Sequence, residues 1–191
     1  VVRRVRHTEV SMVRTSCLWS SQGGIRVMKA AKTRFVSDEA TFGNIYNNLS
    51  TLEKDKEAAA QQAEIICFPE MCIQGYSREI PDFLLQSIDG EAILFLKKLA
   101  QNKGITIIAG MAEKCLNKRP FITQVVIRPG QNIDYYPKEH LGNSEQPYYQ
   151  GGDEIKNFST ADATIRIKIC GTWLVNRIWI IISPPDAPGF P

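Results

Sequence analysis

The sequence predicts an α/β protein with a layered sheet of mixed strand directions, and three features carry that prediction. Segments that are expected to be strands recur along the chain, at residues 25–32, 65–68 and 105–109, and the last two of them are apolar runs. Segments with helical periodicity stand between these runs, and such an alternation is typical of α/β layers. A hairpin then follows around Pro129-Gly130, which adds antiparallel strands to the sheet.

The first helix is expected over residues 44–62, after turn and capping residues at 38–44. Its charged side chains lie on other faces than its apolar stripe, so they are interpreted as a solvated face and not as a binding patch. The apolar stripe consists of Ile45, Leu49, Leu52, Ala59 and Ala63.

A second helix is expected after Asp89, whose side chain can act as its N-cap. Apolar residues then follow the i, i+3, i+4, i+7, i+8 pattern of one helix face, and Gly104 stands just past the expected end. The members of this pattern are Ala92, Phe95, Leu96, Leu99 and Ala100.

The remaining elements are strands and loops. The hairpin strands are expected at residues 121–128 and 132–136, and a long polar loop is expected over 142–163. Further strands are expected at 164–170 and 178–183. The proline-rich residues 184–191 can form neither a helix nor a central strand, so they are predicted to be a tail.

Composition indicates one soluble globular domain, with 191 residues of which 43% are hydrophobic and 23% charged. A net charge of +3 gives little support to a nucleic-acid partner, and no apolar run approaches the length that crosses a bilayer. We therefore expect neither nucleic acid nor a membrane as a partner. The five cysteines are odd in number and contain no C-x-x-C pair, which predicts a reducing, cytoplasmic compartment without a zinc site.

The start of the chain admits two interpretations. Residues 1–24 are basic, contain several serines and carry Glu9 as their only acid, a composition that faintly resembles a mitochondrial transit peptide. The other interpretation takes Met28 as the functional start and residues 1–24 as a poorly structured extension. The expected organisation is then an extension over 1–24, an incomplete domain over 25–183 and the tail.

Chemically versatile side chains stand at three expected strand ends. Pro69 cannot donate to a central ladder, so pairing should stop there and leave Glu70 at the carboxyl end of its strand, where open α/β sheets bind ligands. Lys138 stands just beyond the hairpin, and Cys170 ends the strand at 164–170. By alternation, Cys170 lies on the opposite side of its strand from the isoleucines at 165, 167 and 169, so it is not one more member of that apolar face.

With these residues in view, the chain resembles the nitrilase, or carbon-nitrogen hydrolase, superfamily. Phe68-Pro69-Glu70 followed by Gly75-Tyr76 is similar to its glutamate motif, and its lysine motif is similar to Tyr136-Pro137-Lys138-Glu139-His140-Leu141. The resemblance runs from about residue 25 to 170. It implies a nitrilase-like αββα sandwich, of which the C-terminal part is missing or replaced in this chain.

The resemblance also implies an activity. It is the hydrolysis of a non-peptide carbon-nitrogen bond in a small amide, nitrile or carbamoyl compound, through a Glu-Lys-Cys triad and a thioester. Glu70 would be the base, Cys170 the nucleophile and Lys138 the group that stabilises the tetrahedral intermediate, while Glu145 would contact the lysine and help to position substrate. No metal or organic cofactor is implied, and a homo-oligomer, in the simplest case a homodimer, is expected.

Two alternatives stay open at the level of sequence. His140 could serve as the base to Cys170 in place of Glu70, or it could be a hydrogen-bonded loop histidine; Cys67 is interpreted as a small buried hydrophobe. The chain could also be a catalytically inactive family member that acts as a binding or interaction module. After Cys170 the family usually continues with an aromatic residue, an acidic residue and a Pro-Glu pair, whereas this chain reads Gly171-Thr172-Trp173-Leu174.

Overall fold

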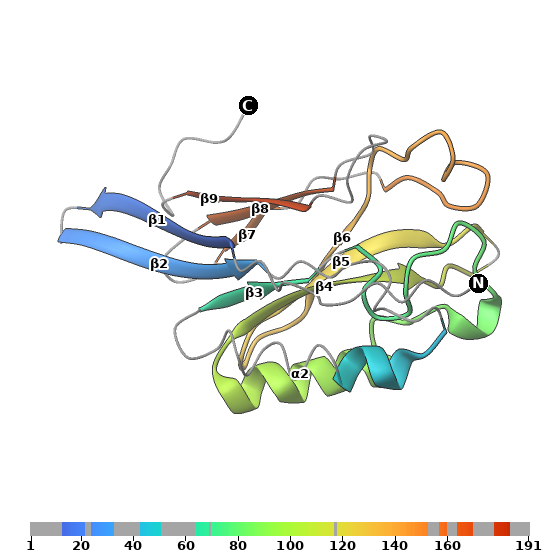
Figure 1. Cartoon of the computed structure of the whole chain (residues 1–191), viewed down its shortest axis with the longest axis horizontal. Helices are drawn as coiled ribbons and strands as arrows, with labels where there is room; N and C mark the ends of the chain where they lie inside the picture. Colours follow the sequence, from blue (N-terminus) through green and yellow to red (C-terminus); the bar gives the residue numbers. More distant parts are fainter. Residues whose placement is uncertain are drawn as a thin grey trace, which may run out of the picture.

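The computed structural model describes residues 13–21, 24–32, 43–50, 64–68, 70–116, 118–152, 157–159, 164–169 and 178–183. Cys170, the proline-rich tail and the second part of the first expected helix lie outside these residues. The described elements form two sheets and a helix layer (Figure 1). Every described helix is too short or too polar to span a bilayer.

The larger sheet has six strands in the order β1-β2-β3-β4-β5-β6. The three strands β2, β3 and β4 run parallel, while β1 on one side and β5 and β6 on the other run antiparallel to their neighbours. The predicted mixture of strand directions is therefore confirmed. The bounds are β1 Val13–Ser21, β2 Gly24–Lys32, β3 Ile65–Cys67, β4 Thr106–Glu113, β5 Phe121–Ile127 and β6 Asp134–Pro137.

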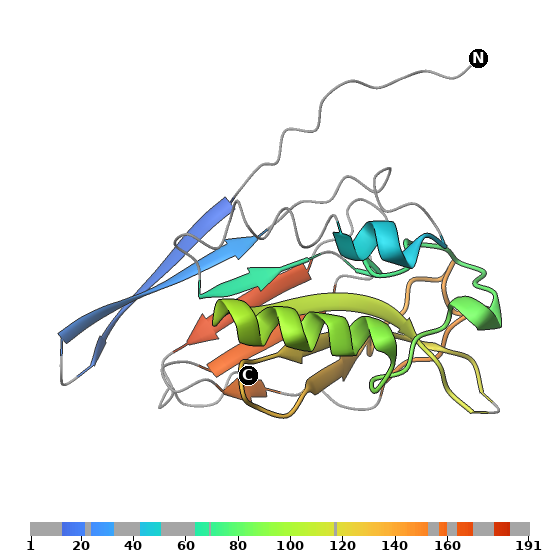
Figure 2. The same ribbon diagram turned by 90° about the horizontal axis from the view of Figure 1, so that it is seen from below.

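Strand β1 corrects one expectation. Residues 13–21 were expected within a poorly structured extension, but they pair with β2 over their whole length, from Val13 opposite Lys32 to Ser21 opposite Gly24. The two strands project as a ribbon beyond the rest of the sheet (Figures 1 and 2). Apolar residues stand at 13, 17 and 19 and polar residues at 14, 16 and 20, which is a strand signal. The basic composition of residues 1–24 as a whole obscured it.

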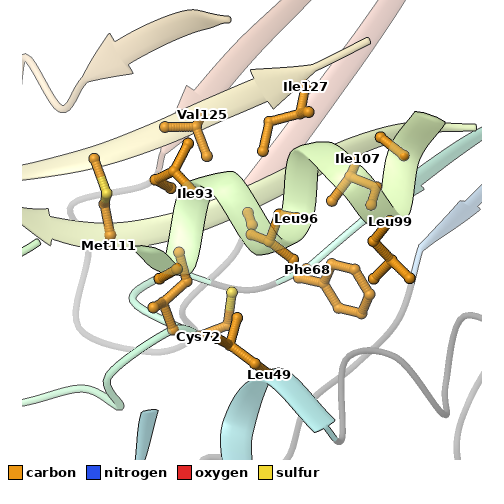
Figure 3. Close-up of a cluster of buried hydrophobic side chains, with 14 of the residues drawn as sticks. Leu49, Phe68, Cys72, Ile93, Leu96, Leu99, Ile107, Met111, Val125 and Ile127 are labelled. Carbon is orange, nitrogen blue, oxygen red and sulfur yellow. The ribbon is translucent and has the colours of Figure 1, made fainter. Parts of the chain in front are cut away.

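One face of the six-stranded sheet is covered by α2, Glu91–Lys103, and by the helical residues 45–50 (Figures 1 and 2). Between these helices and the sheet lies the main apolar core, in which β4 and β5 contribute alternate residues (Figure 3). The labelled members of this core are Leu49, Phe68, Cys72, Ile93, Leu96, Leu99, Ile107, Met111, Val125 and Ile127.

The C-terminal end of α2 is as predicted, but its N-cap is not. Gly104 follows the helix in the left-handed conformation, with φ 63°, and its N–H bonds to the carbonyls of Ala100 and Gln101, as predicted for a terminating glycine. The N-cap, however, is Gly90 and makes no side-chain hydrogen bond, so the expected capping by Asp89 is wrong. The Asp89 carboxylate instead accepts a hydrogen bond from the hydroxyl of Ser87.

The second sheet lies on the opposite face of the six-stranded sheet from α2 (Figure 1). It consists of β7 Asn157–Ser159, β8 Thr164–Ile169 and β9 Ile178–Ser183, all antiparallel. Strands β8 and β9 confirm two expected strands. Strand β7 corrects the expected polar loop over 142–163, because three residues are too few for a periodic signal; its Phe158 is nonetheless buried opposite Ile165.

Candidate functional site

Glu70 lies where β3 has ended and its neighbour β4 continues. Phe68 N–H still donates to Ile108 O at 2.8 Å, after which residues 70–74 form a turn beside the second half of β4. Hydrogen bonds to β4 hold this turn, among them one from Ile73 N–H to Gly110 O at 3.2 Å and one from Gln74 Nε2 to Ala112 O at 3.1 Å. The expected strand-end position of Glu70 is therefore confirmed.

The turn approaches β4 so closely that only glycine fits at position 110. A Cβ built on Gly110 would lie 2.5 Å from Met71 N and 2.9 Å from Glu70 Cα, distances that real Cβ atoms essentially never show. Met71 has a φ of 53°, a left-handed conformation that is uncommon for a residue with a side chain. Gly110 and Met71 together determine where the Glu70 backbone lies.

Lys138 follows β6 directly and keeps the ladder with β5 for one more bond. Its N–H donates to Ile122 O at 2.7 Å, and its carbonyl accepts from Gly152 N–H at 2.9 Å. The pairing of Tyr136 with Gln124 puts Lys138 on the same sheet face as Ile122 and Gln124, which is the face away from α2. The Lys138 side chain thus lies on the side of the second sheet.

Glu145 belongs to a turn over residues 143–148 that brings its side chain back to the lysine. Its N–H donates to Gly142 O and its Oε2 accepts from Gly142 N–H, both at 2.8 Å. The turn continues to Tyr149, whose N–H donates to Glu145 O at 2.9 Å and whose hydroxyl donates to Ser77 O at 2.5 Å. The turn is therefore tied to the segment that follows Glu70.

These three side chains form one buried ionic cluster. Lys138 Nζ donates to Glu70 Oε1 at 2.9 Å and to both carboxylate oxygens of Glu145, at 3.0 and 2.9 Å. The exposed fractions are 4% for Glu70, 1% for Lys138 and 6% for Glu145. Two carboxylates thus surround one ammonium, so the ionised cluster carries a net negative charge.

Within the cluster, the pKa values of Glu70 and Lys138 are shifted from their ordinary values. Burial raises the pKa of Glu70 above its ordinary value, since the attraction of Lys138 only partly offsets the loss of water around the carboxylate. Burial lowers the pKa of Lys138, but the two carboxylates raise it by more, so the net shift is upward. Lys138 is therefore an ammonium ion at neutral pH.

Tyr76 joins the cluster although the sequence assigned it no role of its own. Its hydroxyl donates to Glu145 Oε1 at 3.2 Å, and burial followed by the Glu145 charge raises its pKa to about 12. The phenol is thus a neutral donor at ordinary pH. Its presence in the Gly75-Tyr76 part of the glutamate motif was the signal that could have found it.

The other candidate residues of the sequence are placed as follows. Cys170 lies just beyond the end of β8 and outside the described residues. His140 has a side chain that is 79% exposed and 3.7 Å from Glu139, so it lies apart from the buried cluster. Cys67 is buried in its strand, as predicted, and Cys72 belongs to the apolar core. Over the residues described, no group of three or more His, Cys, Asp or Glu side chains gathers as metal ligands would.

Comparison with known proteins gives one family match and several relatives. Residues 12–188 match the model of the carbon-nitrogen hydrolase family. The chain is 31% identical over 132 residues to a nitrilase from Pyrococcus abyssi, covering 66% of this chain and 50% of that protein. It is 28% identical over 119 residues to the 2-oxoglutaramate amidase of Bacillus subtilis, covering 61% and 46%. The chain therefore spans about half the length of these curated relatives.

Solved structures show the same fold. A carbon-nitrogen hydrolase superfamily protein from Xanthomonas campestris, with an arsenic adduct in its active site, matches at a TM-score of 0.62 and 21% identity, over 68% of this chain and 49% of that one. An amidase from Nesterenkonia sp. matches at a TM-score of 0.62 and 19% identity, over 75% and 55%. The described sheets and helices are thus those of a nitrilase-like α/β fold.

Proposed function

Because the chain belongs to the carbon-nitrogen hydrolase family, we propose that it hydrolyses a non-peptide carbon-nitrogen bond in a small amide, nitrile or carbamoyl compound. Glu70 acts as the general base, Cys170 as the nucleophile and Lys138 as the group that stabilises the oxyanion. Glu145 is the supporting residue that holds Lys138.

The observation that carries the proposal is the ammonium of Lys138, held between two carboxylates in a buried place. A buried charge is costly unless it is paired, and a lysine fixed by three hydrogen bonds cannot reorganise freely. Such a preorganised positive charge is what an acyl-transfer reaction needs where negative charge develops.

The first half of the reaction forms a thioester. Glu70 takes the thiol proton of Cys170, and the sulfur attacks the amide carbon, so that a carbon-sulfur bond forms and the carbonyl electrons move to oxygen. Lys138 stabilises that oxyanion. When the intermediate collapses, the carbon-nitrogen bond breaks and Glu70 returns the proton to the departing ammonia or amine.

The second half releases the acid. Glu70 takes a proton from water, the oxygen of that water attacks the thioester carbon, and the carbon-sulfur bond breaks. The proton returns to the sulfur, which restores the thiol. Losing one oxyanion donor typically costs about 3 kcal/mol of transition-state stabilisation, which sets the contribution expected of Lys138.

The electrostatics of the cluster suit these roles. A thiol has an ordinary pKa of about 8.5, so its base works best when its own pKa is raised toward neutrality. The burial of Glu70 shifts its pKa in that direction. Lys138 keeps its proton at neutral pH because its pKa is raised.

The relatives support the substrate class and the nucleophile. One is a nitrilase and another a 2-oxoglutaramate amidase, so both bond types occur among proteins similar to this chain. In a glutamate-to-glutamine variant of the Nesterenkonia sp. amidase, acrylamide has added to the active-site cysteine. In this chain we assign the same role to Cys170, which follows the last residue of β8 in the sequence.

The direct test is ammonia release from a panel of small amides and nitriles by the purified chain. We expect turnover, and we expect Cys170→Ala and Glu70→Gln to abolish it. Cys115→Ala is the matched control, because Cys115 is a partly exposed cysteine to which the mechanism assigns no role. Absence of ammonia from every substrate would contradict the proposal and favour the inactive binding module. Turnover that survives Cys170→Ala would refute the assigned nucleophile.

A further inference from the structure

Gln124 is a buried polar residue that the mechanism does not use. It lies in the middle of β5, its exposed fraction is 0%, and neither Oε1 nor Nε2 has a hydrogen-bond partner among the described residues. A buried carboxamide without partners is costly, because both of its polar ends have left water without compensation. Its presence therefore calls for a group that the described residues do not supply.

The side chain of Gln124 extends from the same sheet face as Lys138 and lies near the backbone of Glu70. Gln124 pairs with Gly110 on one side and with Tyr136 on the other, on the sheet face from which Lys138 also extends. Its Nε2 occupies the space that a side chain at Gly110 would fill, and Glu70 Cα lies 2.9 Å from that same Cβ position. The carboxamide thus lies against the backbone of Glu70.

A second buried glutamine shows the contrast. Gln74 is also completely buried and lies in the same turn as Glu70. Its Oε1 likewise has no partner among the described residues, but its Nε2 donates to Ala112 O at 3.1 Å. Gln74 therefore holds the turn against β4. Gln124 makes no comparable bond to the part of the chain that is described.

The charge of the ionic cluster limits which chemical groups can bind beside the Gln124 carboxamide. Glu70 and Glu145 outnumber Lys138, so a negative group beside Glu70 would be repelled. The carboxamide itself offers one acceptor and two donors. A neutral group that both donates and accepts, such as a second carboxamide or a hydroxyl, fits these conditions.

We propose that Gln124 contacts the substrate and selects small amides whose acyl part carries a neutral hydrogen-bonding group, over amides with a purely aliphatic acyl part. The proposal rests on the proposed function, since it places substrate beside Glu70. A site with buried polar groups strongly rejects a substrate analogue that leaves those groups without hydrogen bonds. An apolar pocket discriminates less between substrates that differ by one small group.

The stability of the free chain tests the first step without any substrate. Gln124→Leu removes the unpaired carboxamide, so the urea midpoint of unfolding should stay level or rise. Gln74→Leu is the matched control and should lower the midpoint, because the Ala112 carbonyl loses its donor. If Gln124→Leu lowers the midpoint as far as Gln74→Leu does, Gln124 is a structural residue and the proposal is overturned.

Selectivity is measured by calorimetric binding in the Cys170→Ala background, where hydrolysis is blocked. The probes are malonamide and 3-methylbutanamide, which have the same number of heavy atoms and differ in the neutral polar group. We expect malonamide to bind about tenfold more tightly, and Gln124→Leu to remove this preference. An unchanged ratio, or binding of neither amide, overturns the proposal. If the preference holds but the wild-type chain releases no ammonia, the proposed hydrolysis fails while the selection by Gln124 stands.

Discussion

Lys138 and Glu70 are 68 residues apart in sequence, yet Lys138 Nζ lies 2.9 Å from Glu70 Oε1 with both side chains buried. The contact joins the end of β6 to the end of β3, two strands that are separated in the sheet by β4 and β5. A buried ion pair is not in itself a source of stability, because desolvation offsets the attraction. Each residue of the pair keeps the other's charge from being buried without a partner, and this coupling can be measured in the free energy of unfolding.

Replacing Lys138 with methionine should lower the free energy of unfolding by about 3–5 kcal/mol, because two buried carboxylates lose their only charge partner among the described side chains. Urea unfolding checks this, with Lys97→Met on the exposed side of α2 as control. Adding Glu70→Gln to Lys138→Met should recover part of the loss. Additive effects of the two substitutions would contradict the coupling.

Gly110→Ala should destabilise the chain by about 1–3 kcal/mol and reduce turnover, because the new Cβ meets the backbone of Glu70 and Met71. Gly104→Ala is the control: its φ is 63°, but nothing lies within 4 Å of the added Cβ, so it measures backbone strain alone. Thermal unfolding and ammonia release are the measurements. Equal turnover in the two variants would show that Gly110 does not position Glu70.

The pH dependence of stability should report the raised pKa of Glu70. The folded chain holds the Glu70 proton more tightly than the unfolded chain does, so this contribution to stability is present below pH 4.5 and is lost as pH rises through the raised pKa. Glu70→Gln does not titrate, so wild type should lose stability relative to this variant as pH rises above 4.5. Urea midpoints measured across that range, with Glu79→Gln as an exposed control, provide the test. If wild type instead gains stability relative to Glu70→Gln as pH rises, the pKa of Glu70 is not raised and the prediction is wrong.

Tyr76→Phe should cost about 1 kcal/mol of stability and lower turnover, because Glu145 loses a donor that helps to hold it against Lys138. The effect should be constant through neutral pH, since the pKa of Tyr76 is raised to about 12. Tyr148→Phe, an exposed neighbour in the Glu145 turn, is the matched control and should change neither quantity. Equal effects of both variants would argue against the Tyr76 hydroxyl.

Cys170 should be the most reactive of the five thiols, because the proposed mechanism puts a base and an ammonium beside it. Cys67 and Cys72 are buried, and burial raises the pKa of Cys72 to about 12, so neither should compete. Substoichiometric iodoacetamide followed by peptide mass mapping gives the order of labelling. Earlier labelling of Cys115 or Cys17 would count against an assembled triad.

The sequence by itself determined the local elements and the residues to watch. Continuous apolar runs predicted β3 and the start of β4, and the apolar face and Gly104 predicted α2 and its end. These signals are local, because periodicity and turn chemistry act within a few residues. The strand-end positions of Glu70 and Lys138 followed in the same way, since a proline or the end of a hairpin marks where pairing stops.

The family resemblance implied that Glu145 contacts Lys138, but the residues and their spacing did not, and only the tertiary structure decided how these side chains meet. The closeness of Glu70 and Lys138 depends on strand order and register, the fit of Gly110 depends on the turn that crosses it, and the capture of Lys138 by Glu145 depends on a loop without periodicity. The pairing of β1 with β2 likewise arises between segments, and so does the burial of Gln124 without a hydrogen-bond partner among the described residues. Contacts of this kind come from packing of distant segments, for which no residue type or spacing in one segment is a sufficient signal.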